Sequence, residues 1–329
     1  MATRDELRPR RREPPLRQDR RRRNAVHTRI AGAQPVSVFT VVTVSTVALE
    51  LFSEVRPRLF GIAYRMLGSA LDAEDLLQEV WLRWQNYDHD EVKNPAAFLA
   101  TVTTRLAINA GQTARARHET YVGPWLPEPV DTSADPQLGA ERDAALQIAV
   151  LVLLEKLTPT ERAAYVLREA FDYPYPQIAE IIQVSEASAR QLVSRARKHL
   201  AAERRTPVSA AEQKRLLTAF VAAAKDGDMA KLEELLAADV VSYADSNGTV
   251  RGASKVPVVG RLVVAKVIKA YSNTFWTGAD ITWAEVNGQP AAVLRRDGHI
   301  YCVLSVTASD NGIDQLLWMM NPDKLAAFG

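Results

Sequence analysis

Residues 176–200, PQIAEIIQVSEASARQLVSRARKHL, carry the clearest structural pattern in the middle of the chain. A short apolar helix, a tight turn at Gln183-Val184-Ser185 and a longer amphipathic helix together predict a helix-turn-helix. Ser185 is expected to cap the second helix. The buried stripe of that helix is predicted to be Ala189, Leu192, Val193, Ala196 and Leu200.

The outward face of this second helix is polar and basic. It carries Ser188, Arg190, Gln191, Ser194, Arg195 and Arg197. In a helix-turn-helix, the first residues of the second helix contact base edges and the others contact phosphates. An Arg-rich helix taken alone is equally compatible with a solvated surface. The preceding helix, LTPTERAAYVLREAF at residues 157–171, favours the DNA-binding interpretation because it completes the motif.

A second amphipathic helix is predicted at residues 72–84, DAEDLLQEVWLRW, with Asp72 as its N-cap. Apolar residues recur at the spacing of one helical face. The opposite face offers Asp75, Gln78, Glu79, Leu82 and Arg83. Periodicity alone supports an ordinary surface helix just as well.

A third helix follows at residues 95–118, PAAFLATVTTRLAINAGQTARARH, opened by Asn94-Pro95. Its side chains available for nucleic acid are Arg105, Asn109, Arg115 and Arg117. Gly111 should weaken the helix by roughly 1 kcal/mol relative to alanine.

Charge is distributed unevenly over the 329 residues. Residues 1–29 hold eleven arginines and four acids, whereas the remaining residues have a net negative charge. This basic arm could bind phosphates. Alternatively, it is a disordered tail, or the start codon has been assigned too early. Cys302 is the single cysteine, so no internal disulfide can form. No apolar run approaches the ~20 residues of a membrane span, and we expect a cytoplasmic protein without a membrane partner.

Breaks in periodicity divide the chain. The predicted parts are a basic arm (1–43), a helical domain (44–120), a Pro-rich linker (121–137), a helix-turn-helix domain (138–203) and a C-terminal α+β domain (204–329). In the last part we expect helices at 210–224, 229–237 and 255–276 and a strand at 240–244. Antiparallel hairpins should follow at Asn287-Gly288, Asp297-Gly298 and Asn311-Gly312.

The amino-acid sequences of residues 72–84 and 176–200 resemble those of extracytoplasmic-function RNA polymerase sigma factors. The resemblance implies two all-α sigma domains, the second a helix-turn-helix. It also implies that the face around Asp75 and Leu82 binds the clamp of core RNA polymerase. The helix at 95–118 would then hold a melted −10 promoter element, and the helix at 186–200 would read a −35 element. Promoter DNA and core polymerase are the expected partners.

The linker segment YVGPWLPEPV, residues 121–130, resembles the joining motif of the sigma-factor group with a SnoaL-like C-terminal domain. That resemblance implies an NTF2-like, cone-shaped α+β fold that regulates the sigma domains. Its regulatory residues would be Trp125, Leu126, Pro127, Glu128 and Pro129, with Asp245, Ser246, Asn247, Gly248, Asn321, Pro322, Asp323 and Lys324. Charge contacts here are expected to be exposed and worth about 0–1 kcal/mol each, less than burial of Trp125.

An enzymatic alternative remains, because relatives of the cone fold include polyketide cyclases. Candidate acid–base groups are Asp245, Asp280, Glu285 and His299, although they form no paired constellation. His299 follows a hairpin turn and is expected at the surface. We expect no cofactor, no metal and no catalytic residue, and a pocket that could hold a small-molecule ligand of unknown identity.

Overall fold

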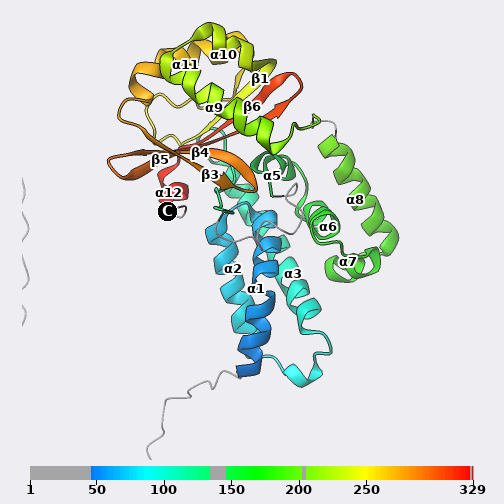
Figure 1. Ribbon diagram of the computed structural model, residues 1–329. Helices are drawn as coiled ribbons and strands as arrows, with labels where there is room; N and C mark the ends of the chain where they lie inside the picture. Colours follow the sequence, from blue (N-terminus) through cyan, green and yellow to red (C-terminus); the bar gives the residue numbers. More distant parts are fainter. Residues whose placement is uncertain (1–45, 134–145, 202–204, 327, 329) are drawn as a thin grey trace, which may run out of the picture. The chain divides into compact units, whose positions relative to one another are not determined.

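The computed structural model describes residues 46–133, 146–201, 205–326 and 328 (Figure 1). The chain divides into two units, Met1–Thr43 and Val44–Gly329, and the helices and strands described here belong to the second. The basic arm and the predicted helical start at residues 138–145 lie outside the described residues. None of the described helices is both long enough and apolar enough to cross a membrane.

The first helical domain consists of α1 (Thr46–Leu67), α2 (Ala70–Gln85), a short 3-10 turn (His89–Glu91) and α3 (Pro95–Glu119). The predicted N-cap of α2 is wrong: Ser69 caps it and accepts the Asp72 N–H at 3.0 Å. Gly68 adopts a φ of 70°, which lets the chain turn so sharply that α2 begins earlier than periodicity suggests. Asn94 caps α3 as predicted, accepting the Ala97 N–H.

The second helical domain consists of α5 (Ile148–Leu154), α6 (Pro159–Glu169), α7 (Tyr175–Ile182) and α8 (Glu186–Ala201). Thr158 and Glu161 form a reciprocal capping box at the start of α6. Gln183 turns the chain in the left-handed region, and Ser185 accepts the Ser188 N–H at 3.1 Å. The helix-turn-helix and its cap are thereby confirmed.

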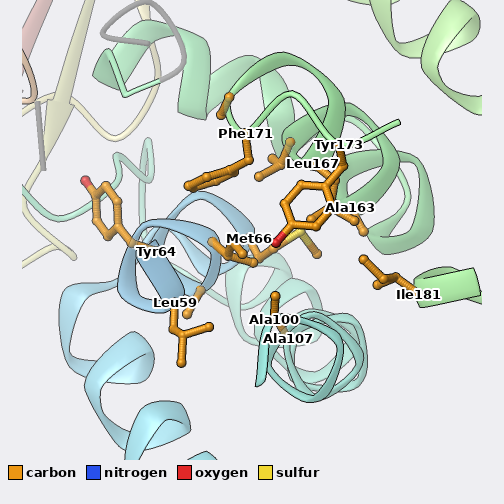
Figure 2. Packing of buried hydrophobic residues seen from close by; sticks show 14 of the residues in the cluster. Leu59, Tyr64, Met66, Ala100, Ala107, Ala163, Leu167, Phe171, Tyr173 and Ile181 are labelled. Atoms are coloured by element: carbon orange, nitrogen blue, oxygen red, sulfur yellow. The ribbon is translucent and has the colours of Figure 1, made fainter. Parts of the chain in front are cut away.

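Both helical domains contribute to one hydrophobic core. Figure 2 shows Met66 of α1 and Ala107 of α3 in the same interior as Ala163 and Leu167 of α6. Polar contacts reinforce the junction, because Arg162 Nε donates to the Arg65 carbonyl at 2.8 Å. The linker separates the two domains in sequence, but their buried side chains form a single cluster.

The C-terminal domain begins with α9 (Ala210–Asp226) and α10 (Met229–Leu235), followed by β1 (Leu236–Asp245), β2 (Val258–Val259) and α11 (Arg261–Phe275). Strands β3 (Asp280–Val286), β4 (Gln289–Arg296), β5 (His299–Ser309) and β6 (Gly312–Met319) follow, and α12 (Pro322–Ala326) ends it. The six-stranded sheet has the order β2-β1-β6-β5-β4-β3. Strands β3 to β6 are antiparallel neighbours, which confirms the predicted hairpins.

Two predicted boundaries in this domain are wrong. The strand starts at Leu236 and not at 240, so it takes the end of the predicted second helix. The third helix starts at Arg261 and not at 255, because Pro257 disfavours a helical residue before it and Gly260 has a φ of 93°. Residues 246–257 therefore form a long loop between β1 and β2, which becomes important for the linker.

The sheet separates two apolar clusters. On one face α9, α10 and α11 cover a core that includes Phe220, Trp276 and Trp318. On the other face lie Leu126 of the linker, Ile148 of α5 and Leu325 of α12. Figure 1 shows α9–α11 on one side of the sheet and α12 on the other. Since side chains alternate along a strand, neighbouring residues of β1 and β6 serve opposite faces.

Candidate functional site

The outward face of α8 is where the helix-turn-helix predicts it. Arg190, Gln191, Ser194, Arg195 and Arg197 are exposed, and Ser188 is half-buried beside Ser185. Ala189, Val193, Ala196 and Leu200 are buried as predicted, while Leu192 is only partly buried against the core. Six predicted nucleic-acid contacts thus share one surface.

The arginines of this face all have acidic neighbours. Arg190 pairs with Glu186 and lies over the Tyr175 ring, 4.4 Å from its centroid. Arg195 is 3.4 Å from Glu161. Arg197 is 2.7 Å from Glu169, and the hydrogen bond with that carboxylate raises the pKa of Arg197. Glu186 and Glu169 are partly exposed, whereas the Glu161 side chain is only 12% exposed, so Arg190 and Arg197 can exchange their carboxylate for a phosphate or base more readily than Arg195 can.

The predicted face of α2 is also intact. Asp75, Gln78, Glu79, Leu82 and Arg83 are all exposed. Leu82 is 58% exposed and borders a shallow hollow with Tyr87, Phe98 and Val102. Leu82 is therefore part of a contiguous group of apolar side chains, and a contiguous apolar patch rimmed by polar residues is typical of a protein-binding surface.

The predicted residues of α3 are not gathered in one free surface. Arg105 donates from Nε to the Ile181 carbonyl at 2.9 Å and from its terminal nitrogen to the Glu180 carbonyl at 3.0 Å. These carbonyls end α7, where a cation is favourable. Asn109 is exposed, and the side chains of Arg115 and Arg117 lie outside the described residues. Arg105 therefore joins the two helical domains in this arrangement.

The linker and the C-terminal domain meet at a buried ion pair. Lys324 Nζ lies 2.7 Å from Asp245 Oδ2, and the side chains are 8% and 0% exposed. The other oxygen of Asp245 accepts the Tyr121 hydroxyl, and Oδ2 also accepts the Leu126 N–H at 2.7 Å. The expectation of weak, exposed charge contacts here is therefore wrong, because the linker covers both partners.

Lys324 and Tyr121 are strongly influenced by this burial. Lys324 Nζ also donates to the Leu126 carbonyl at 2.5 Å and lies 4.4 Å from the centre of the Trp125 ring. Burial lowers the pKa of Lys324, although Asp245 opposes that shift. The pKa of Tyr121 is raised, first by burial and then by its hydrogen bond to Asp245. Asn321 donates to the Tyr121 hydroxyl at 2.7 Å and completes the network.

The same linker is attached to the first helical domain. Glu128 accepts the Ala70 N–H at 2.6 Å and the Leu71 N–H at 3.2 Å, so it caps α2 from outside. The Trp125 ring packs against Gly68, where even a Cβ would lie 2.5 Å from it. Leu126, Pro127 and Pro129 are buried. The linker is thus held between two domains.

Other predicted regulatory residues have smaller contacts. Asn247 Oδ1 accepts the Val122 N–H at 3.5 Å, and Gly248 lies directly against the Val122 side chain. Ser246 is buried, and its carbonyl accepts bonds from Thr249. Pro322 opens α12 and Asp323 donates its N–H to Asn321. Of these residues, Asn247 and Gly248 contact the linker directly, at Val122, whereas the contacts of Ser246, Pro322 and Asp323 are within the C-terminal domain.

Sequence reasoning missed Asn287 and Tyr64. Asn287 Nδ2 donates to the Tyr64 hydroxyl at 2.6 Å and to the Leu146 carbonyl at 3.1 Å, and its Oδ1 accepts the Val130 N–H at 3.0 Å. The sequence pattern at Asn287-Gly288 predicts only a hairpin turn. Asn287 has a left-handed φ of 53°, which makes the turn, but its fully buried side chain also connects α1, the linker and the residues just before α5.

The four candidate acid–base groups are not gathered around the cavity of the C-terminal domain. Asp280, Glu285 and His299 are exposed, and Asp245 is occupied by the linker. None of the four lines the apolar cavity on the α11 side of the sheet. Within the described residues, no group of three or more His, Cys, Asp or Glu side chains could hold a metal ion.

Comparison with known proteins agrees with this geometry. Residues 51–117 match the family model "Sigma-70 region 2", and residues 147–200 match "Sigma-70, region 4". The chain is 36% identical over 296 residues to the ECF RNA polymerase sigma factor SigJ of Mycobacterium tuberculosis, covering 83% of this chain and 91% of that protein. It is 30% identical over 276 residues to a probable ECF sigma factor, SigI, of the same species, covering 82% and 92%.

A solved structure is similar over the same range. The crystal structure of Mycobacterium tuberculosis SigJ matches with a TM-score of 0.68 at 32% identity, covering 85% of this chain and 99% of that one. The similarity therefore includes the C-terminal domain as well as both helical domains.

Proposed function

Because the chain belongs to the extracytoplasmic-function RNA polymerase sigma factors, its function is the initiation of transcription, and we propose which surfaces perform each step. The helices of region 2 are α1 to α3, and those of region 4 are α5 to α8. The SnoaL-like C-terminal domain follows them.

Region 4 reads a −35 element through the outward face of α8. Arg190 and Gln191 stand near the start of this helix, where base edges are within reach. Arg195 and Arg197 lie further along and bind phosphates. The exposed basic face of α8 is the observation that carries this proposal, because the side chains of Arg190, Arg195 and Arg197 are each more than half exposed.

Region 2 binds the polymerase clamp and a melted −10 element. The face of α2 around Leu82 offers one apolar anchor among charged residues, which suits a protein partner. On α3, Asn109 is accessible, whereas Arg105 is engaged with the end of α7. Arg105 reaches DNA only after regions 2 and 4 separate.

The C-terminal domain regulates this separation by holding the linker. The network of Asp245, Lys324 and Tyr121 fixes one side of the linker, while Glu128 attaches the other side to α2. The −10 and −35 elements are separate stretches of DNA, so we propose that the shared core of regions 2 and 4 must open for both to be bound. The docked arrangement is therefore the resting form, and promoter binding must loosen it.

We assign no catalytic role to the C-terminal domain and no cofactor, and we place the protein in the cytoplasm with core polymerase. The enzymatic alternative has no support in the cavity, whose walls lack the candidate acid–base groups.

Transcription with purified core polymerase tests the proposal. The full chain should yield abortive transcripts from a cognate promoter, and Arg190→Ala should reduce them on that promoter. Lys214→Ala, at an exposed position of α9, is the matched control. A full chain that neither binds core polymerase nor supports transcripts from any promoter would refute the proposed function.

A further inference from the structure

A cavity of about 110 Å³ lies between the sheet and α11 in the C-terminal domain. Its inner wall is formed by Ser242 and Ala244 of β1 with Trp318 of β6 and the adjoining Met320. Phe275 and Trp276 also line the cavity, which is partly open to solvent. None of the residues that form the ion pair and hydrogen bonds with the linker lines this cavity.

The cavity walls are mainly apolar and aromatic. Phe275 lies edge-on to Trp318, with centroids 5.5 Å apart and planes at 88°, and edge-on to Trp276 at 5.1 Å and 83°. Such edges and faces suit a further aromatic ring. Ser242 Oγ accepts the Trp318 indole N–H at 3.0 Å, which leaves its own hydrogen for a ligand oxygen. No Asp, Glu or Lys lines the cavity, and Arg251, an exposed residue, is its one charged lining residue.

The size of the cavity is suited to a single six-membered ring. Apolar cavities of about 150 Å³ are known to bind benzene and stay dry without it. This cavity is somewhat smaller but partly open, so a ring can enter while a substituent extends toward solvent.

The cavity and the linker contact are built from the same strand ends. On β1, Ser242 and Ala244 face the cavity, while Asp245 faces the linker. Directly after the neighbouring strand β6, Met320 lines the cavity and Asn321 donates a hydrogen bond to Tyr121. Alternation along a strand forces this arrangement, because adjacent residues point to opposite faces.

The loop between β1 and β2 connects the two features a second time. Its residues 250–254 line the cavity. The same loop touches the linker at both ends, where Gly248 packs on Val122 and the Lys255 backbone lies next to Gly123. A ligand that orders residues 250–254 must therefore act on a segment that also contacts the linker.

We propose that this cavity is a binding site for a small uncharged aromatic compound and that its occupancy changes the hold of the β1–β2 loop on the linker. The binding site stands by itself, whereas the regulatory consequence rests on the proposed function. By linkage, a linker that changes the loop must in turn change ligand affinity by the same factor.

Binding is tested with p-cresol as the probe and the full chain, followed by calorimetry or ligand-observed NMR. We expect saturable binding to the wild type with a Kd below about 1 mM. Ala244→Leu fills the cavity from β1 and should weaken binding by about tenfold or more. Val267→Phe fills it from α11 at a position 36% exposed, which avoids disturbing the core if Ala244→Leu does not fold. Ala222→Leu, exposed on α9, is the matched control and should bind like the wild type.

Coupling is tested in the same titration with Val122→Ala, which removes the side chain that packs on Gly248. Its affinity for p-cresol should differ from wild type by about threefold or more, whereas exposed Val263→Ala on α11 should not differ. No saturable binding, or binding that both cavity-filling variants leave unchanged, would overturn the site. Equal affinity in Val122→Ala and wild type would overturn the coupling. Neither polymerase nor promoter is present, so these failures are distinct from failure of the transcription assay.

Discussion

Replacing Lys324 by methionine should loosen the linker more than any exposed charge change in the protein. Methionine keeps the apolar stem beside the Trp125 and Tyr121 rings but removes the cation from Asp245, whose side chain is 0% exposed. Removing one partner of a buried pair leaves an uncompensated charge and costs about 3–5 kcal/mol. This is a large share of the roughly 5–15 kcal/mol that stabilises a typical domain.

Hydrogen exchange is the appropriate assay, because the Leu126 N–H donates directly to Asp245 and reports opening of the linker. A loss of about 3–5 kcal/mol corresponds to roughly two to four powers of ten in protection of this amide, up to the limit set by global unfolding. Asp245→Asn placed in the Lys324→Met background should recover part of the loss, because it removes the stranded charge.

Arg205→Met is the matched control. Arg205 pairs with Asp239 and Asp314, but its side chain is 39% exposed, so about 0–1 kcal/mol is expected. If Lys324→Met changed protection of the linker by no more than Arg205→Met does, the buried pair would not stabilise the linker and the reasoning would fail.

Three further outcomes are expected. Arg190→Ala should relax the preference for the −35 sequence by about 1–3 kcal/mol at one base pair, whereas Arg197→Ala should weaken binding to all sequences and reduce its salt dependence. Binding isotherms on matched and mutated promoters at several salt concentrations measure both effects. If sequence preference and salt dependence stayed unchanged in both variants, the assignment of α8 would be contradicted. Asn287→Ala should lower the free energy of unfolding in urea by about 1–3 kcal/mol, because it leaves buried polar groups unpaired, and the left-handed φ at this position adds a further penalty. The control Glu285→Ala, at a position without a left-handed φ, should lower it by less. Equal losses in the two variants would argue that the Asn287 hydrogen bonds do not stabilise the protein. Burial raises the pKa of the Cys302 thiol, so DTNB should react with it slowly at pH 8 in the native protein and rapidly in denaturant, and fast native reaction would show that β5 is exposed.

The helix-turn-helix and the hairpins could be predicted because their signals are local. The stripe from Ala189 to Leu200 follows one helical period, and Asp297-Gly298 makes a turn without help from the rest of the chain. Local signals also misled the prediction, however. Asp72 is a good N-cap by composition, but Ser69 takes that position because Gly68 turns the chain earlier.

The linker network could not be predicted from spacing. Lys324 meets Asp245 across 79 residues, and Arg105 meets the Ile181 carbonyl across 76. Nothing in the periodicity of either segment indicates that the other will cover it. The family resemblance placed the right residues near the linker, but burial, which determines their energy, depends on how the domains pack.

The core shared by regions 2 and 4 has a consequence for how much sigma factor a cell must make. If the docked arrangement is the resting form, as proposed, polymerase binds only the fraction of molecules whose regions have come apart, and its apparent affinity is reduced by that fraction. If docking of Phe171 and its neighbours against α1 is worth about 2.7 kcal/mol, roughly one molecule in a hundred is open and about a hundredfold more protein is needed to occupy the same polymerase. Competition with other sigma factors would then be decided less by the clamp contact than by the interior of the free protein.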